Sequence, residues 1–274
     1  MTSPAPARLE RAFAPLIVFA LVAGLVSVGL DIWQDLSGFG AGVLPLAGLG
    51  PAVGALAGWA AGRGTLRDLM PAPVGQRQVV AHLVLGLVAS AVLVGLLFAG
   101  VALAGVDWPT TDATPDAIPF GITIGGVIVA AALQELGIRG FAQPILELTG
   151  SRLFATVLIG LVWGFWVVQL FPMQNTALTV GAVVLAVAAF AVLLGYLGNG
   201  SVGQRLGVAI LVHAIVASAL TVVTGGGVVT QPVALAFLAA SVVTTLVFMA
   251  MFVVAQRRRA ARRLAANDDA AAQL

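Results

Sequence analysis

Long runs of apolar residues, separated by short polar turns, recur through the whole chain and constrain its fold more than any other feature. Each run has about the 20 residues that a helix needs to cross the hydrocarbon core of a bilayer. The chain is 60% hydrophobic with a mean hydropathy of +1.08, which excludes a soluble fold. The runs do not alternate between apolar and polar residues, so an outer-membrane barrel is excluded as well. The sequence therefore predicts an all-α polytopic membrane protein with about eight transmembrane helices in one bundle.

The expected spans form a single domain, 13–255. They cover about 13–30, 39–61, 79–105, 117–139 with its helix continuing towards Glu147, 153–171, 177–197, 206–224 and 232–255. We expect residues 1–12 to be a cytoplasmic N-terminal segment. Residues 256–274 are expected to be an arginine-rich cytoplasmic tail, disordered from Asn267. The first run is not followed by a small-residue cleavage site, so it is predicted to be an uncleaved span.

The distribution of charge predicts the orientation. Every one of the 13 Lys and Arg residues is an arginine, and with eight spans all of them fall on one side. The opposite side holds Asp31, Asp35, Asp107, Asp112 and Asp116. Because cytoplasmic loops carry the excess of basic residues, we expect a multi-pass protein of the cell membrane with both termini in the cytoplasm. The arginine-rich tail then anchors on membrane lipids, and no nucleic-acid partner is expected.

A few polar residues lie inside the expected spans, where ionisable groups are costly and usually carry function or pair with each other. Glu135 and Arg139 are one helical turn apart, so they can form a structural ion pair or belong to a functional site. His213 lies within another span, as a hydrogen-bonding core residue, a metal ligand or a general base. A single histidine does not make a metal site, and the chain has no cysteine, so neither a metal nor another cofactor is expected.

Two glutamines lie at similar depths in neighbouring expected spans. Gln134 is 16 residues before Gly150, and Gln169 is 18 residues after Ser151. In an antiparallel pair of helices these positions lie at nearly the same level. We therefore expect Gln134 and Gln169 to face each other.

These residues resemble the motifs of the CPBP family of intramembrane endopeptidases, which includes the CAAX prenyl endopeptidases and bacteriocin-processing or immunity proteins. Gln134-Glu135-x-x-x-Arg139 is similar to the family's Glu-Glu-x-x-x-Arg, and Phe165-x-x-x-Gln169 to its Phe-x-x-x-His. His213-x-x-x-Ala217 is similar to its His-x-x-x-Asn/Asp. Residues 49–56 and 63–69 also resemble the family's second span and its basic exit loop, so the resemblance covers roughly residues 40–220.

The resemblance implies a role for each matched position. Gln134 is at the position of the glutamate that activates water, and Gln169 is at the position of the histidine that assists it. His213 and Ala217 are at the positions of the oxyanion-stabilising pair. Glu135 and Arg139 match the framework part of the first motif. Of the implied catalytic positions, His213 alone keeps the expected chemistry.

The substitutions leave two functions open. The first follows from the chemistry of glutamine, because its amide cannot accept a proton near neutral pH. The protein would then be a degenerate, non-catalytic family member that binds a membrane peptide, a lipid or a partner protein in an intramembrane cavity. The alternative is an active endopeptidase that cleaves a prenylated or other membrane-associated peptide near the cytoplasmic face. In that arrangement Glu135 is the base and His213 its partner, which requires Glu135 to turn away from Arg139. A small-solute transporter is less well supported, because the spans lack matching Gly/Pro-broken segments.

Overall fold

The computed structural model describes residues 5–39, 43–62, 66, 70–107, 109, 118–170 and 172–271, and nearly all of these are helical. The helices run in chain order as α1 (Ala5–Ser37), η1 (Leu46–Leu49), α2 (Gly50–Ala61), α3 (Gln76–Leu103), α4 (Phe120–Gly137), η3 (Ile138–Ala142), α5 (Gln143–Thr149), α6 (Arg152–Leu170), α7 (Ala177–Leu197), α8 (Val202–Thr224) and α9 (Gln231–Ala271). The predicted all-α membrane fold is confirmed.

Seven of the described helices are long and apolar enough to cross a membrane. The expected span at 39–61 is the exception, because its apolar helix covers only Leu46–Ala61. Gly38 ends α1 with a positive φ of 65°, and Pro45 precedes the 3₁₀ turn η1, so the chain becomes helical later than its hydropathy indicates. Twelve α-helical and four 3₁₀ residues span roughly 26 Å, slightly less than the hydrocarbon core.

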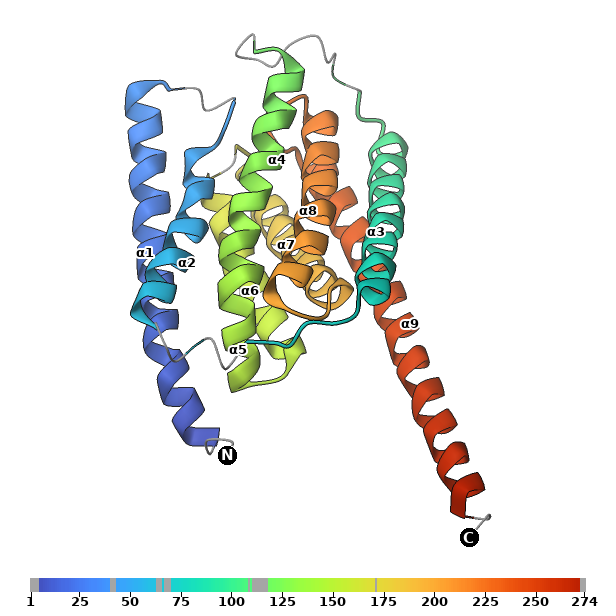
Figure 1. The fold of residues 1–274 in the computed structure, drawn as a ribbon. Coiled ribbons are helices and arrows are strands. Elements are labelled where there is room, and N and C mark those ends of the chain that lie inside the picture. The colour runs from blue at the N-terminus through green and yellow to red at the C-terminus, as the bar shows by residue number, and fades with distance from the viewer. Residues whose placement is uncertain are drawn as a thin grey trace.

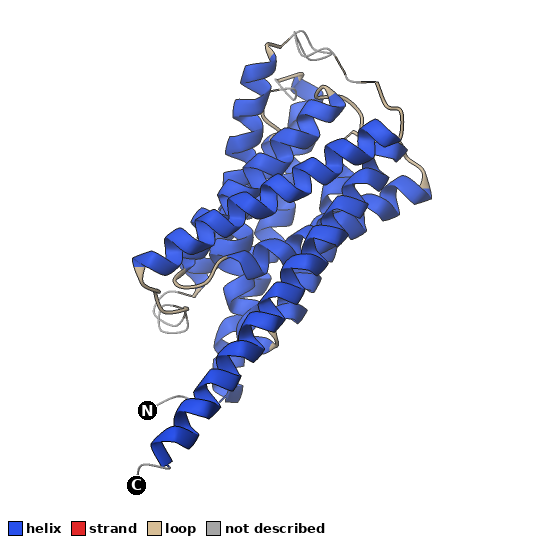
Figure 2. Cartoon of the chain, turned by 90° about the vertical axis from the view of Figure 1, so that its right-hand side faces the viewer, coloured by secondary structure: helices blue, strands red, loops and turns tan. Residues whose placement is uncertain are grey.

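The C-terminal tail differs from its expected disorder. Helix α9 is 41 residues long and continues to Ala271, well beyond the membrane-spanning part that ends at Arg258. Figure 2 shows its C-terminal part projecting from the bundle as a single helix. After Pro232 the sequence contains no glycine or proline, and the tail is rich in alanine and arginine, which are among the best helix formers.

The helices form one bundle in which both termini leave at the same end (Figure 1). Helices α1 and α2 pack together as a hairpin, and α2 lies against α4. Helix α4 continues through the π-helical segment η3 into α5, which confirms that the fourth span extends to Glu147. The turn before α8 is fixed by a capping box between Ser201 and Gln204, and the Gln204 side chain also bonds the backbone N–H and carbonyl of Val74.

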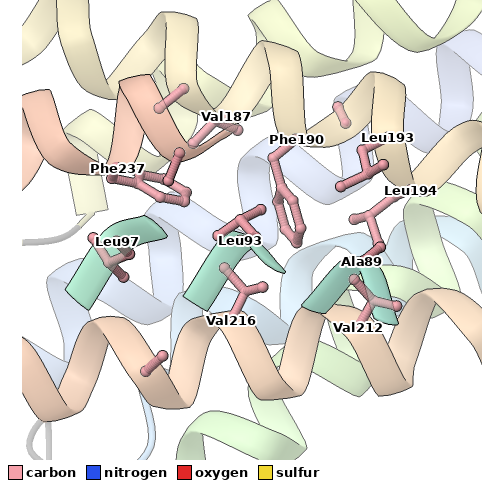
Figure 3. Packing of buried hydrophobic residues seen from close by; sticks show 14 of the residues in the cluster. Ala89, Leu93, Leu97, Val187, Phe190, Leu193, Leu194, Val212, Val216 and Phe237 are labelled. Atoms are coloured by element: carbon pink, nitrogen blue, oxygen red, sulfur yellow. The ribbon is translucent and has the colours of Figure 1, made fainter. Parts of the chain in front are cut away.

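The apolar core lies between α3, α7, α8 and α9 (Figure 3). Phe190 of α7 is 2% exposed and lies among Leu93, Val212 and Val216. Its ring packs edge-on against His213 of α8, with ring centroids 5.9 Å apart. The core therefore extends directly to the polar residues singled out from the sequence.

Helices α6 and α7 approach closely at two glycines one turn apart. A Cβ atom on Gly160 would lie 2.6 Å from the Cα of Ala188, and one on Gly164 would lie 2.8 Å from the carbonyl oxygen of Val184. Small residues at this spacing let the backbones of membrane helices come together. The two glycines thereby set the position of every other side chain that α6 directs into the bundle.

We expect Gly160→Leu to lower the free energy of unfolding by about 2 kcal/mol or more, because the added side chain meets the α7 backbone. Thermal unfolding in lipid nanodiscs measures this, with Gly181→Leu on α7 as the control, since a Cβ there meets nothing within 4 Å. Equal melting temperatures for the two variants would contradict the close packing of α6 on α7.

Candidate functional site

Glu135 and His213 form the centre of a buried polar site where α4 meets α8. Glu135 is 0% exposed and His213 is 7% exposed. His213 Nδ1 lies 2.9 Å from Glu135 Oε1, within hydrogen-bonding distance. Two residues that are 78 positions apart in the chain are thus joined directly inside the bundle.

Arg139 lies on the other side of the same carboxylate. Its Nε is 3.6 Å from Glu135 Oε2, which is a charge interaction at a distance too long for a hydrogen bond. Its Nη2 donates to the backbone carbonyl of Ala191 on α7 at 3.0 Å. Glu135 therefore contacts Arg139 and His213 at once, and it meets the histidine without turning away from the arginine.

Gln134 has a different partner from the one the sequence indicated. It is 4% exposed, and its Oε1 accepts the indole N–H of Trp163 on α6 at 3.1 Å. The Trp163 ring also packs edge-on against His213 at 4.9 Å between centroids, and the guanidinium of Arg139 lies 5.7 Å from the ring centroid. One tryptophan thus contacts the amide, the imidazole and the guanidinium of the site.

The expectation that Gln134 and Gln169 face each other is wrong. Gln169 is exposed near the end of α6, six residues beyond Trp163. Gln134 and Gln169 would lie at one level if α4 and α6 packed as a close antiparallel pair, which they do not, and the π-helical turn η3 adds a smaller shift. Gln134 is bonded to Trp163 of α6 and not to Gln169.

The contact between Gln134 and Trp163 also changes which residues of α6 correspond to the second motif. Phe165, its expected first residue, is 59% exposed, whereas Trp163 faces the site. Read from Trp163, the aromatic-x-x-x pattern ends at Val167, a partly buried residue that packs against the core. Residues four apart on a helix share a face, so Val167 occupies the place for which Gln169 was predicted.

Ala217 lies one turn beyond His213 on α8 and is half-buried. Its methyl group offers no hydrogen bond, and its backbone carbonyl accepts one from the Thr221 hydroxyl at 2.9 Å. Within the described ranges, no group of three or more His, Cys, Asp or Glu side chains is arranged to hold a metal ion.

Trp163 and Phe190 are the site residues that sequence reasoning missed. Trp163 looked like one apolar residue among many in its span, and Phe190 has no polar atom. A signal for Trp163 was present, because a buried indole N–H needs an acceptor and Gln134 is one of few side-chain acceptors in the neighbouring span.

We expect Trp163→Phe to lower the free energy of unfolding by about 1–3 kcal/mol, because the buried Gln134 carbonyl loses its donor while the aromatic packing largely remains. Equilibrium unfolding in detergent measures this change. Trp166→Phe, on the same helix, is the matched control and should cost less. A cost at Trp163 no greater than at Trp166 would count against the hydrogen bond.

Comparison with known families bears on this site directly. Residues 115–219 match the family model described as type II CAAX prenyl endopeptidase Rce1-like. No curated protein matches the chain. The matched segment contains Gln134, Glu135, Arg139, His213 and Ala217, together with the newly placed Trp163 and Val167. Over residues 115–219 the chain is therefore similar to the Rce1-like CAAX prenyl endopeptidases, which confirms the CPBP resemblance of its motifs.

Proposed function

We propose that this Rce1-like membrane protein binds a membrane-anchored peptide beside Gln134 and does not hydrolyse it. The observation that carries the proposal is the hydrogen bond between Gln134 and Trp163. It puts a neutral amide, already bonded through its oxygen, at the position where the family resemblance implies a water-activating carboxylate. An amide has no useful basicity, so it cannot take a proton from water.

The other implied catalytic positions support the same conclusion. Val167, on the site-facing surface of α6, has no proton-accepting group, and Ala217 has no donor for an oxyanion. Glu135 is fully buried, with one oxygen bonded to His213 and the other facing Arg139. This carboxylate serves as a link between α4, η3 and α8.

A ligand site beside Gln134 is supported by the small residue opposite it. A Cβ on Gly48 of η1 would lie 3.5 Å from Gln134 Nε2 and 3.5 Å from the Cβ of Ala130. Gln134 Nε2 carries two N–H donors, which suit the backbone carbonyls of an extended peptide. Gly48 is buried and has no side chain, so the η1 backbone lies directly beside this amide.

We further propose that the end of the bundle carrying both termini faces the cytoplasm of a cell. Arg77, Arg152 and Arg205 lie in helix starts at that end, and α9 continues there into its arginine-rich tail (Figure 1). Asp31 and Asp107 lie towards the opposite end. This is the distribution that the positive-inside rule associates with cytoplasmic termini.

A second candidate function rests on the Glu135–His213 hydrogen bond. A carboxylate joined to an imidazole is an acid–base pair, and such a pair can activate water if water reaches it. An endopeptidase of this kind would depend on both residues. Loss of peptide cleavage in Glu135→Gln and in His213→Ala would identify it.

Binding is tested by photo-crosslinking in nanodiscs, with a prenylated peptide that carries a photoreactive residue near its C-terminus. We expect wild type to crosslink the peptide intact and Gly48→Leu to lose most of the crosslink, because the larger side chain would take the place of the peptide beside Gln134. Gly48→Ala is the matched control and should retain it, since a Cβ there makes ordinary contacts. Equal crosslinking by wild type and Gly48→Leu would refute the placement of the ligand.

A further inference from the structure

Four polar residues lie in a row from the buried site to the end of the bundle that carries both termini. We name Glu135, Arg139, Gln143 and Glu147, on α4, η3 and α5, the polar stripe. The first three are 0–2% exposed and Glu147 is 16% exposed, so the stripe begins at the centre of the bundle and ends near its surface. Its 12-residue length corresponds to roughly 18 Å of helix.

The π-helical turn keeps these residues on one face. In an α-helix, residues four apart drift around the axis by about 40° per step, so three such steps would carry Glu147 far from the line of Glu135. The wider turn of η3 rotates less per residue and offsets part of this drift. The contacts follow the stripe, because Arg139 lies beside Glu135 at its inner end and Gln143 bonds Glu147 at its outer end.

The outer end of the polar stripe is held by two arginines. Glu147 Oε2 accepts from Arg205 Nη1 at 2.6 Å, and Glu147 Oε1 lies 3.4 Å from Arg152 Nε. Gln143 Nε2 donates to Glu147 Oε1 at 2.8 Å. Arg152 and Arg205 start α6 and α8 at the bundle end, so the stripe reaches the level of the polar turns.

Unpartnered polar atoms are concentrated on this stripe. Among the described residues, eight buried side-chain nitrogen or oxygen atoms have no hydrogen-bond partner. Four of the eight belong to the stripe, namely Glu135 Oε2, Arg139 Nε, Arg139 Nη1 and Gln143 Oε1, and a fifth is Nε of Arg152, which lies beside Glu147. The other three are hydroxyl oxygens at or within α9, away from the stripe.

A buried polar atom without a partner costs about 1–3 kcal/mol, so proteins pair such atoms with one another or with ordered water. The five atoms include N–H donors on Arg139 and oxygen acceptors on Glu135 and Gln143. A water molecule needs two to four such partners, and donors and acceptors follow each other along the stripe. The set suits a row of water molecules better than a single ion, which would need groups of one sign.

We propose that the polar stripe binds a file of ordered water molecules that connects the Glu135–His213 pair with solvent at the end of the bundle carrying both termini. Through this file, water and protons reach a pair that is closed off by protein and lipid elsewhere. The proposal holds whether or not the site cleaves a peptide bond, because it concerns access to the pair and not its chemistry.

Water-edited solid-state NMR on proteoliposomes tests the proposal, because it measures magnetisation transfer from water to individual side chains. The Arg139 side-chain signal is assigned by its disappearance in Arg139→Lys. In wild type we expect transfer from water to Arg139 although it is buried. In Gln143→Leu, which interrupts the stripe with an apolar side chain of similar size, we expect this transfer to be lost.

Two further variants make the result specific. Ser241→Ala removes one of the unpartnered hydroxyls outside the stripe and should leave the transfer to Arg139 unchanged. Gln143→Ser keeps a hydrogen-bonding group and should retain it. Absence of transfer to Arg139 in wild type, beside normal transfer to the exposed Arg77, would overturn the proposal. Full transfer in Gln143→Leu would overturn it as well, since the water would then reach the site by another route.

Discussion

Replacing Arg139 with methionine is expected to lower the free energy of unfolding by about 3–5 kcal/mol, the largest single effect on stability that we predict. The substitution keeps the length of the side chain but leaves the Glu135 carboxylate inside the bundle without its neighbouring positive charge. The hydrogen bond between Glu135 and His213 does not replace the guanidinium charge. The substitution also removes the hydrogen bond that Arg139 donates to the Ala191 carbonyl, which joins η3 to α7.

Reversible unfolding in mixed detergent micelles measures this loss. The matched control is Arg77→Met, an exposed arginine at the start of α3, which should change stability by less than about 0.5 kcal/mol. The double variant Glu135→Leu, Arg139→Met removes both charges and should recover most of the loss, because an apolar pair can replace a buried ion pair. A double variant no more stable than Arg139→Met would contradict the uncompensated charge as the cause.

Restoring three family positions together is expected to produce peptidase activity, which our proposal predicts the wild type lacks. Gln134→Glu supplies a carboxylate, Val167→His supplies an imidazole on the site-facing surface of α6, and Ala217→Asn supplies a donor one turn beyond His213. General acid–base groups contribute about 10²–10⁴ in rate, so cleavage of a prenylated membrane peptide should rise by that order above background. Mass spectrometry of the products from nanodisc reactions measures it.

The choice of Val167 is tested by a matched variant that differs in one position. This matched variant is Gln134→Glu, Gln169→His, Ala217→Asn. It follows the motif as it is counted from Phe165, which faces outward. Its histidine is exposed near the end of α6, so we expect no gain in cleavage. Activity in the variant with Gln169→His and none in the variant with Val167→His would contradict the assignment of Val167 to the site.

The fold could be predicted from hydropathy because few backbone structures are stable inside a bilayer. A run of about 20 apolar residues has to satisfy its backbone hydrogen bonds internally, so it becomes a helix. Two segments differ from the prediction because local backbone geometry prevailed there. Pro45 and the turn before it shortened the second apolar helix, and the alanines and arginines of the tail continued α9 to Ala271 where disorder was expected.

The site was predicted in part for a similar reason. The spacing of Glu135 and Arg139 is a local property of one helix, and their contact followed from it. The bond from Glu135 to His213 crosses from α4 to α8, and it was foreseen only as a rearrangement. Gln169 was misplaced because residue spacing shows neither that α4 and α6 are not close neighbours nor that a π-helical turn interrupts the segment between them.

The central claim is that Gln134 makes this Rce1-like site non-hydrolytic. It is tested most directly by incubating the purified wild-type protein in nanodiscs with a pool of prenylated and unprenylated membrane-anchored peptides and analysing the products by mass spectrometry. Our account predicts no product from the wild type and products from the Gln134→Glu, Val167→His, Ala217→Asn variant under the same conditions. Products from the wild type that disappear in Glu135→Gln and in His213→Ala would contradict it and establish the Glu135–His213 pair as a working acid–base pair.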